Sequence, residues 1–302
     1  MIVEYLKKDG SKVDISQLKE TMSIRGDKGT RARVLSLQYV AVKDDPNIPR
    51  FMAENGNAIK ITENNQEIFF GYILNVSYNE TSNSASLEAY DPLYYFKNKT
   101  VEKYKNKKAE EIAKDLCSKF GIPVNSLATT TKLITKLYVS KNLYEIIDDA
   151  YSQSGKYYVD YYNNGLVIKK VGSEELKIQL KVGENLSELS HSEDATQVVN
   201  QVILIDDKGN KLGAPEVDSN SIKKYGLMQE TANKRDEAKS LLKGPEMSTT
   251  LTVVPGDLSI RTGKKVRVVS SHFDLEYTIA SDTHTWDGEN YSVQVTLDYE
   301  GA

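Results

Sequence analysis

Two stretches near opposite ends of the chain carry the same order of turn glycine and alternating apolar residues. A shift of 207 residues aligns them, with one added residue before the last strand. The matched pairs are Gly56 and Gly263, Ile59 and Val266, Ile61 and Val268, Ile68 and Leu275, Phe70 and Tyr277, Tyr72 and Ile279, Ala85 and Val293, Leu87 and Val295, and Ala89 and Leu297. Because a slip of one residue would turn every apolar side chain of a strand outward, this register predicts a duplicated antiparallel sheet. The alternative is that any two antiparallel meanders match this loosely.

Residues 1–96 show one strand pattern after another. Apolar and polar residues alternate along 34–40, 59–61, 68–76 and 85–89, and clusters of Asp, Asn, Gly and Ser separate these runs. Period-two patterning with frequent turns is typical of an antiparallel sheet or barrel. We therefore expect residues 1–96 to form a first β-barrel domain.

The period changes in residues 97–176, which we expect to form a small α+β insert domain. Apolar residues recur at helical spacing along 109–120. A second helix is predicted to open with Ser140 as its N-cap. Residues 157–168 then predict a hairpin with an Asn-Gly turn at Asn164-Gly165.

Residues 177–302 predict a second β-barrel domain that carries one helix near 231–243. The expected strands are 198–205, 247–254, 266–269, 275–280 and 291–299. The fold class is therefore mainly β with an α+β insert: two similar antiparallel β-barrel domains flank a small helix-containing domain.

The composition argues against several classes of function. The formal net charge of −4 is unlike that of a dedicated nucleic-acid binder, because phosphate contacts need a basic surface. Cys117 is the only cysteine, which excludes an internal disulfide and a cysteine-based metal site. The N-terminus lacks the features of a secretion signal, and every apolar run is too short to span a bilayer. We expect a soluble protein made in the cytoplasm.

Two histidine regions are candidates for chemistry. His272, Asp274, Asp282 and His284 have the residue types of a metal site, but the predicted strand 275–280 separates the two pairs, so we favour structural roles. His191 has a serine and acidic residues beside it. Neighbours on one loop cannot easily point at one another as a catalytic triad requires, and there is no Gly-x-Ser-x-Gly pattern.

Other polar and reactive residues also have structural interpretations. Cys117 lies on the apolar stripe of its helix, which indicates a buried small side chain rather than a nucleophile. Residues 206–210 resemble the start of a calcium loop, but their spacing is wrong and they predict a hairpin turn. A carboxylate pair for sugar hydrolysis stays open, because 43 acidic residues offer many pairs. We therefore predict no catalytic, cofactor-binding or metal-ligating residue.

Four segments resemble the baseplate hub family of contractile phage tails, and most of all the XkdQ-type proteins of phage-like prophage elements. No single match is specific, but their order runs across nearly the whole chain. They are the strand at 66–73 with its central Gly71, the segment 89–96, the loop 221–226, and the group formed by Pro255-Gly256-Asp257, Gly263 and His284.

The resemblance implies a structural subunit without a cofactor, assembled in the bacterial cytoplasm and located in the baseplate of a phage or tail-like bacteriocin. It implies a homotrimer whose two barrels per subunit form a pseudo-six-fold ring between a hexameric tail tube and a trimeric central spike. The implied partners are the tail tube protein, the central spike protein and other baseplate or tape-measure components.

Two other functions remain open from the sequence. One is a cell-wall-degrading hydrolase of a phage tail, which would use an unrecognised carboxylate pair or the region of His272 and His284. The other is a carbohydrate-binding module. A hub predicts a protein that is inert on cell walls and forms trimers, whereas a hydrolase predicts that the purified protein clears cell walls.

Overall fold

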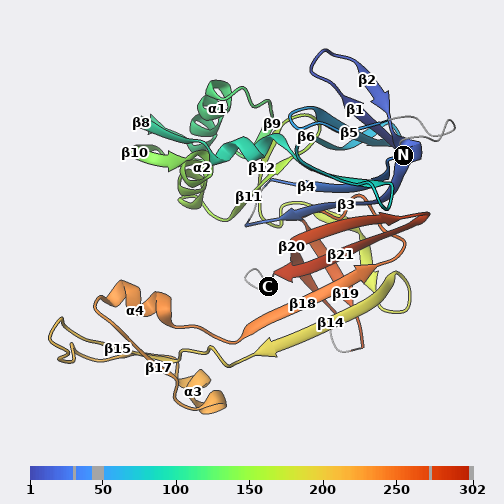
Figure 1. Ribbon diagram of the computed structural model, residues 1–302. Coiled ribbons are helices and arrows are strands. Elements are labelled where there is room, and N and C mark those ends of the chain that lie inside the picture. The colour runs from blue at the N-terminus through green and yellow to red at the C-terminus, as the bar shows by residue number, and fades with distance from the viewer. Residues whose placement is uncertain (30–31, 43–50, 272–273, 299–302) are drawn as a thin grey trace. The chain divides into compact units, whose positions relative to one another are not determined.

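The structure of the protein is a computed structural model, and it describes residues 1–29, 32–42, 51–271 and 274–298 (Figure 1). The chain divides into two compact units. The large unit consists of Met1–Leu189 together with Leu251–Ala302, and the small unit consists of Ser190–Thr250. None of the described helices is long and apolar enough to cross a membrane.

The first part of the chain is an antiparallel sheet. Its sheet order is β3-β4-β7-β6-β5-β1-β2, and a short 3-10 helix, η1, lies at Ser16–Leu18. The strands are β1 (Ile2–Leu6), β2 (Lys12–Asp14), β3 (Lys19–Asp27), β4 (Val34–Val40), β5 (Ala58–Glu63), β6 (Gln66–Asn79) and β7 (Ser84–Tyr90). Their inward side chains form one core, and Trp286 from the far end of the chain packs into it.

The last part of the chain repeats this plan. Its strands are β13 (Glu175–Lys181), β14 (Leu186–Asp194), β18 (Glu246–Val253), β19 (Lys265–Val269), β20 (Asp274–Asp287) and β21 (Asn290–Asp298). Two of these strands, β14 and β18, have residues in both units. Their order β14-β18-β21-β20-β19-β13 corresponds, strand for strand and in chain order, to β3-β4-β7-β6-β5-β1. One difference is that β13 runs parallel to β19, whereas β1 runs antiparallel to β5.

Equivalent backbone hydrogen bonds support the duplication. Gly56 donates its N–H to the carbonyl of Ile73 at 2.7 Å, and Gly263 donates to Ile279 at 2.8 Å. Both glycines have a positive φ, +84° and +87°. The predicted repeat is therefore confirmed in strand order, but three predicted matches were wrong by one residue. Leu275, Tyr277 and Ile279 correspond to Phe69, Gly71 and Ile73 rather than to Ile68, Phe70 and Tyr72.

The cause of that error is a bulge. β6 buries Phe69, Gly71 and Ile73 in succession, rather than Phe70 and Tyr72, because its pairing with β5 skips one residue, Ile68, between Phe69 and Glu67. β19 and β20 pair without such a shift. A second bulge is common to both halves: β6 shifts its pairing with β7 after Ile73, and β20 shifts its pairing with β21 after Ile279. An extra residue in a strand changes which of the following side chains point inward. The alternation of apolar and polar residues in the sequence does not show where this happens.

The mainly β fold is confirmed, but two closed barrels are not. Among the described residues the strand pairs form one continuous sheet in which β20 pairs with β3, and neither half closes on itself. The division of the chain at residues 96 and 176 stays a prediction.

An α+β segment lies between the two halves in the sequence, and Figure 1 shows its helices to one side of the strands of the first half. It contains the 3-10 helix η2 (Pro92–Lys97), β8 (Lys99–Lys107), α1 (Ala109–Lys119), β9 (Val124–Leu127), β10 (Ile134–Asn142), α2 (Leu143–Ser152), β11 (Tyr157–Tyr161) and β12 (Leu166–Lys170). The first predicted helix is confirmed. The predicted cap of the second was wrong, because Asn142 and Glu145 form its capping box instead of Ser140.

The hairpin β11–β12 is confirmed, but its turn differs from the prediction. Asn163 and Asn164 have positive φ values of 49° and 59°, and Tyr162 donates its N–H to Gly165. The turn is therefore centred on two asparagines, which tolerate the left-handed region better than most residues.

The small unit, residues 190–250, contains β15 (Gln201–Leu204), β16 (Glu216–Val217), α3 (Ser219–Tyr225), β17 (Gln229–Ala232) and α4 (Arg235–Leu241). The predicted helix over 231–243 was too long: residues up to Ala232 pair with β15, and only α4 is helical. The turn predicted at 206–210 is confirmed by the N–H of Asp206 donating to the carbonyl of Asn210.

Candidate functional site

A buried group of charged residues lies where the two halves and the α+β segment meet within the large unit. Arg33 precedes β4, Asp160 lies on β11, Arg261 precedes β19, and Asp282 lies on β20. These side chains come from all three parts, and each residue is at most 9% exposed. We call Arg33, Asp160, Arg261 and Asp282 the junction network.

Arg33 links the first half to both other parts. Its Nη1 and Nη2 atoms each donate to a different oxygen of Asp282 at 2.8 Å, and its Nε donates to Asp160 at 3.2 Å. Burial opposes its positive charge, but Asp282 and Asp160 raise the pKa of Arg33 above its usual value. Gly26 of β3 leaves room for this guanidinium, because an added Cβ would lie 2.7 Å from it.

Asp160 is held by a second arginine. Arg261 donates from Nε and Nη2 to the two oxygens of Asp160, each at 2.9 Å. Burial works against the ionised form, but Arg261 and Arg33 hold the pKa of Asp160 below its usual value. Two planar guanidinium groups therefore enclose one carboxylate.

Asp282 has further donors on the second half. Thr262 donates its backbone N–H at 2.6 Å and its hydroxyl at 2.7 Å, and His284 Nε2 lies 3.3 Å from the carboxylate. Burial again opposes ionisation, but Arg33 and the hydrogen bond from His284 hold the pKa of Asp282 well below its usual value.

His284 is a buried structural histidine. Its Nε2 donates to the carbonyl of Ile260 at 2.9 Å, and its Nδ1 shares a hydrogen bond of 2.7 Å with the Tyr291 hydroxyl. The ring of Tyr291 stacks on Trp286 with centroids 4.7 Å apart. Of the predicted histidine and aspartate group, the structure brings together only Asp282 and His284. Asp274 instead pairs with Arg267, and His272 lies outside the described residues.

Asp91 lies at the edge of the junction network. It accepts the backbone N–H of Arg33 at 2.8 Å and that of Leu93 at 2.9 Å, which caps η2. Burial raises the pKa of Asp91 to about 8, although the N–H of Arg33 favours the ionised form. This carboxyl therefore differs from Asp160 and Asp282, which have arginine partners.

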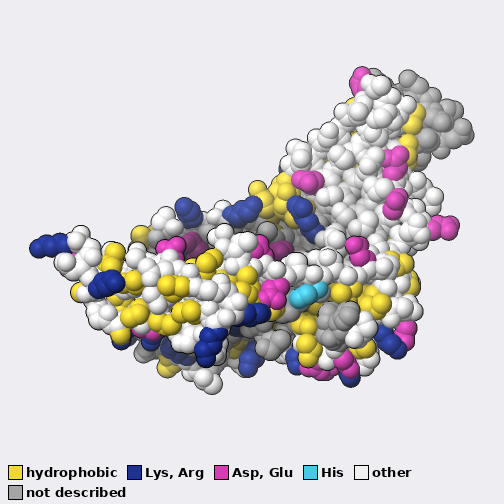
Figure 2. Space-filling view, turned by 90° about the horizontal axis from the view of Figure 1, so that it is seen from below, with side chains coloured by type: hydrophobic (Ala, Val, Ile, Leu, Met, Phe, Trp, Pro, Cys, Tyr) yellow, Lys and Arg dark blue, Asp and Glu magenta, His cyan; other side chains and the backbone are white. Residues whose placement is uncertain are grey.

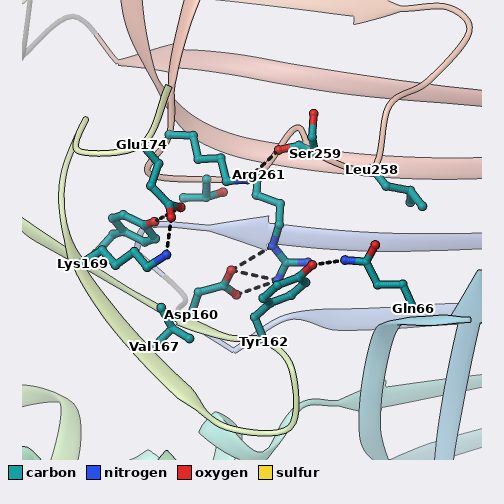
Figure 3. A pocket seen from close by; sticks show the side chains of 12 residues that line it. Gln66, Asp160, Tyr162, Val167, Lys169, Glu174, Leu258, Ser259 and Arg261 are labelled. Atoms are coloured by element: carbon teal, nitrogen blue, oxygen red, sulfur yellow. Dashed lines mark hydrogen bonds and ion pairs between the residues drawn. The ribbon is translucent and has the colours of Figure 1, made fainter. Parts of the chain in front are cut away.

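A pocket of about 230 Å³ opens beside Arg261 and Asp160 (Figure 3). Glu174 accepts hydrogen bonds from Lys169 and from the Tyr158 hydroxyl, and Gln66 contacts the Tyr162 hydroxyl across the pocket. Burial opposes ionisation of Glu174, but Lys169 holds its pKa below the usual value. The two carboxylates in the pocket are therefore ionised and paired with cations.

The remaining sequence candidates are not members of the junction network. His191 is exposed on β14, and its Nδ1 contacts the Thr249 hydroxyl at 2.8 Å. Cys117 is fully buried in α1, and burial raises the pKa of its thiol to about 12. Among the described residues, no three His, Cys, Asp or Glu side chains gather as metal ligands. Figure 2 shows acidic and basic side chains mixed on one face, unlike the continuous basic surface of a nucleic-acid binder.

Sequence reasoning missed Arg33, Asp160 and Arg261. The sequence did carry a signal. Asp160 and Asp282 each stand at a strand position whose side chain points inward, where an unpaired charge would be costly. The partners could not be named, because Arg33 lies 249 residues from Asp282.

Comparisons with known proteins agree with the fold. The sequence model of the YQBQ-like family matches residues 22–298. The phage-like element PBSX protein XkdQ of Bacillus subtilis (strain 168) is 26% identical over 246 residues, covering 78% of this chain and 74% of that protein. A prophage MuSo2 43 kDa tail protein from Shewanella oneidensis has a TM-score of 0.71 at 15% identity, over 98% of this chain and 97% of that one. A tail protein from Neisseria meningitidis MC58 has a TM-score of 0.67 at 12% identity, over 99% and 97%.

Proposed function

Because the chain belongs to the YQBQ-like family, we propose that it is a structural hub subunit in the baseplate of a contractile phage tail or tail-like particle. The fold it shares with phage tail proteins supports this proposal. The observation that carries it is the duplicated six-strand order, which gives each chain two equivalent halves.

The duplication suits an adaptor between two symmetries. Three copies of a chain with two equivalent halves present six equivalent surfaces, which fit a hexameric tail tube, while the trimer itself fits a trimeric central spike. The proposed partners are thus the tail tube protein, the spike protein and other baseplate or tape-measure components. The proposed location is the baseplate, after assembly in the bacterial cytoplasm.

The charged groups support a role without catalysis. A retaining or inverting glycosidase needs one carboxyl group that is protonated and one that is ionised. Asp160 and Glu174, which line the pocket, both have lowered pKa values and cationic partners, so neither suits the acid. Asp91 has a raised pKa, but it is 2% exposed and its oxygens accept backbone N–H groups.

Two measurements on the purified full chain test the proposal. Sedimentation velocity and negative-stain imaging should show trimeric rings, and a cell-wall clearing assay should show no activity. The variants His191→Gln and His284→Gln serve as controls for the hydrolase alternative. Clearing by the wild type that either variant abolishes, or a chain that stays monomeric at every concentration, would overturn the hub assignment.

A further inference from the structure

The two-stranded sheet of β8 and β10 in the α+β segment has one covered face. Tyr104 of β8 and Tyr138 of β10 pack into the core that α1 and α2 share, and they are 6% and 3% exposed. Successive side chains of a strand point to opposite faces of the sheet. The residues that alternate with these tyrosines form the other face, which we call the open face and which consists of Val101, Lys103, Lys105, Leu137 and Val139.

The apolar side chains of the open face have little cover. Val101, Leu137 and Val139 are 65%, 57% and 60% exposed, and Leu133 just before β10 is 58% exposed. Among the described residues, the only other large hydrophobic side chain exposed to this degree is Leu227, in the small unit. Exposed apolar residues that are scattered singly are normal, but a group of them marks an interaction surface.

The strand register brings the two valines of this group together. Glu102 of β8 pairs with Tyr138 of β10 in an antiparallel ladder. The residue before Glu102 therefore lies beside the residue after Tyr138. Val101 and Val139 are thus neighbours on the open face, where cross-strand side chains lie close enough to form one apolar patch.

Lysines border this apolar patch. Lys103 pairs with Leu137 in the strand register, and Lys105 lies two residues further along β8. Both lysines are exposed, and neither forms an ion pair with a described residue, whereas Lys136 of β10 pairs with Asp149 at 2.7 Å. The margin of the open face is therefore positively charged.

The carboxylates closest to these lysines in the sequence are engaged elsewhere. Glu102 pairs with Lys119 of α1 at 2.6 Å. Glu110 accepts hydrogen bonds from the backbone N–H and the hydroxyl of Thr130, at 3.0 and 2.7 Å. Glu111 belongs to the capping box at the start of α1. These three carboxylates therefore do not pair with the lysines of the open face.

We propose that the open face binds a second protein, through a surface on which carboxylates surround apolar side chains. An apolar centre with a charged margin is the usual arrangement of a protein interface, and Asp or Glu on the partner would match Lys103 and Lys105. Val101, Leu137 and Val139 would leave water on binding. The open face is present in a single copy, so this interaction goes beyond the proposed hub and does not depend on it.

Other occupants match the open face less well. A second copy placed face to face would set lysines against lysines, which repel. Nucleic acid would pair its phosphates with the lysines but leave the apolar side chains in water. Segments that bind a membrane surface usually carry Trp or Phe beside their lysines, and the five residues of the open face include neither. An acidic protein surface is therefore the occupant that uses both features of the open face.

Methyl NMR of the full-length chain tests this assignment. The probe is a peptide that repeats Val-Val-Glu-Glu, because as a strand it shows Val and Glu in turn on each face. The methyl resonances of Val101, Leu137 and Val139 should shift on titration, and those of Leu227, which is equally exposed, should not. Peptides that repeat Val-Val-Lys-Lys or Ser-Ser-Glu-Glu should cause little change. Equal shifts at Leu227, or equal binding of the lysine peptide, would overturn the assignment.

Reversal of the charge gives a second measurement. Lys103→Glu/Lys105→Glu should weaken binding of the glutamate peptide by about tenfold and should bind the lysine peptide instead. The matched control Lys208→Glu/Lys211→Glu makes the same change of charge at exposed positions of the small unit, and it should bind as the wild type does. If the reversal leaves both affinities unchanged, the open face is not the binding surface.

Vesicles separate a protein partner from a membrane. Vesicles that contain phosphatidylserine should leave the methyl resonances of the open face unchanged. Broadening of these resonances by vesicles, without a response to the glutamate peptide, would replace the protein partner by a membrane surface. Sedimentation of the same samples reports trimer formation separately, so a failure of the hub and a failure of the open face give different results.

Discussion

Arg33 and Asp282, which lie 249 residues apart in the sequence, form a buried ion pair in which both guanidinium Nη atoms contact the carboxylate at 2.8 Å. The pair joins the first half of the chain to the second. Asp160 extends it to the α+β segment through its contacts with Arg33 and Arg261. The junction network therefore connects parts of the chain whose own cores are separate.

Arg33→Ala should destabilise the protein strongly. Removing one partner of a buried pair leaves the other charge uncompensated, which costs about 3–5 kcal/mol of unfolding free energy. The measurement is urea denaturation at neutral pH. Arg267→Ala is the matched control, because Arg267 makes the same two-pronged contact with Asp274 on an exposed surface, where solvent screens the ion pair and the loss should be much smaller. Equal losses in the two variants would contradict a stabilising role for the junction network.

Asp91→Asn should change how stability depends on pH. The pKa of Asp91 is raised from 3.8 to about 8 in the folded state, so its contribution is fully present below about pH 4 and is lost as the pH rises towards 8. The wild type should therefore lose stability relative to Asp91→Asn over that range, by at most about 1.4 kcal/mol per pH unit. Denaturation curves of both proteins across the range check this, and a constant difference would refute it.

Asp160 and Asp282 should give stability a pH dependence opposite to that of Asp91. Their folded pKa values are lowered, so the stability they contribute is present above about pH 4 and is lost as the pH falls below it. Asp282→Asn should therefore be most destabilising near neutral pH, and its difference from the wild type should shrink in acid. Thermal denaturation along an acid series measures this difference. A gap that stays the same down to the acid limit would mean that Asp282 is not ionised in the fold.

Gly263→Ala should cost more than its backbone conformation explains. An added Cβ at Gly263 would lie 2.3 Å from the ring of Tyr158, and the residue has φ +87°. Gly10→Ala is the control, because Gly10 has φ +86° and an added Cβ there meets nothing within 4 Å. We expect a loss of about 1–2 kcal/mol for Gly10→Ala and about 1–3 kcal/mol more for Gly263→Ala.

A second substitution checks why Gly263→Ala should lose more stability than Gly10→Ala. Tyr158→Ala should remove most of the extra cost of Gly263→Ala, because it removes the ring that the new methyl group would meet. Urea denaturation of the two single variants and the double variant gives the coupling free energy. Additive losses would show that the ring is not the obstacle.

Cys117 should react slowly with thiol reagents in the folded protein. It is fully buried, and burial raises its pKa to about 12, so little thiolate is present at neutral pH. Labelling with a maleimide, followed by mass spectrometry, should be slow in buffer and fast in denaturant. Rapid labelling of the native chain would indicate that α1 opens readily from the core of the α+β segment.

The strand succession and the first helix were predictable, because each is set by local periodicity. α1 has Ile112, Ala113 and Leu116 on one buried stripe, and that spacing is readable without a partner. The cap at Asn142 was also readable in principle, since Asn142 and Glu145 have capping-box spacing. The bulges in β6 and β20 could not be predicted, because the residue types of these strands do not show where the register changes.

The junction network could not be derived from one sequence for a different reason. Its members are two arginines and two aspartates among 39 basic and 43 acidic residues, and their pairing depends on how distant strands meet. The prediction that His284 has a structural role was closer, because inward-facing polar residues on a strand need partners. Those partners proved to be Tyr291, Ile260 and Asp282.

β20 belongs to both halves at once, since its first residues pair with β19 and its last residues pair with β3. A change in the angle between the halves would have to bend this single strand or break its bonds to β3. The large unit is thus built without a hinge at its centre. A mechanical load applied to one half would therefore pass to the other through the continuous backbone of β20, so the two halves would move together as one rigid body.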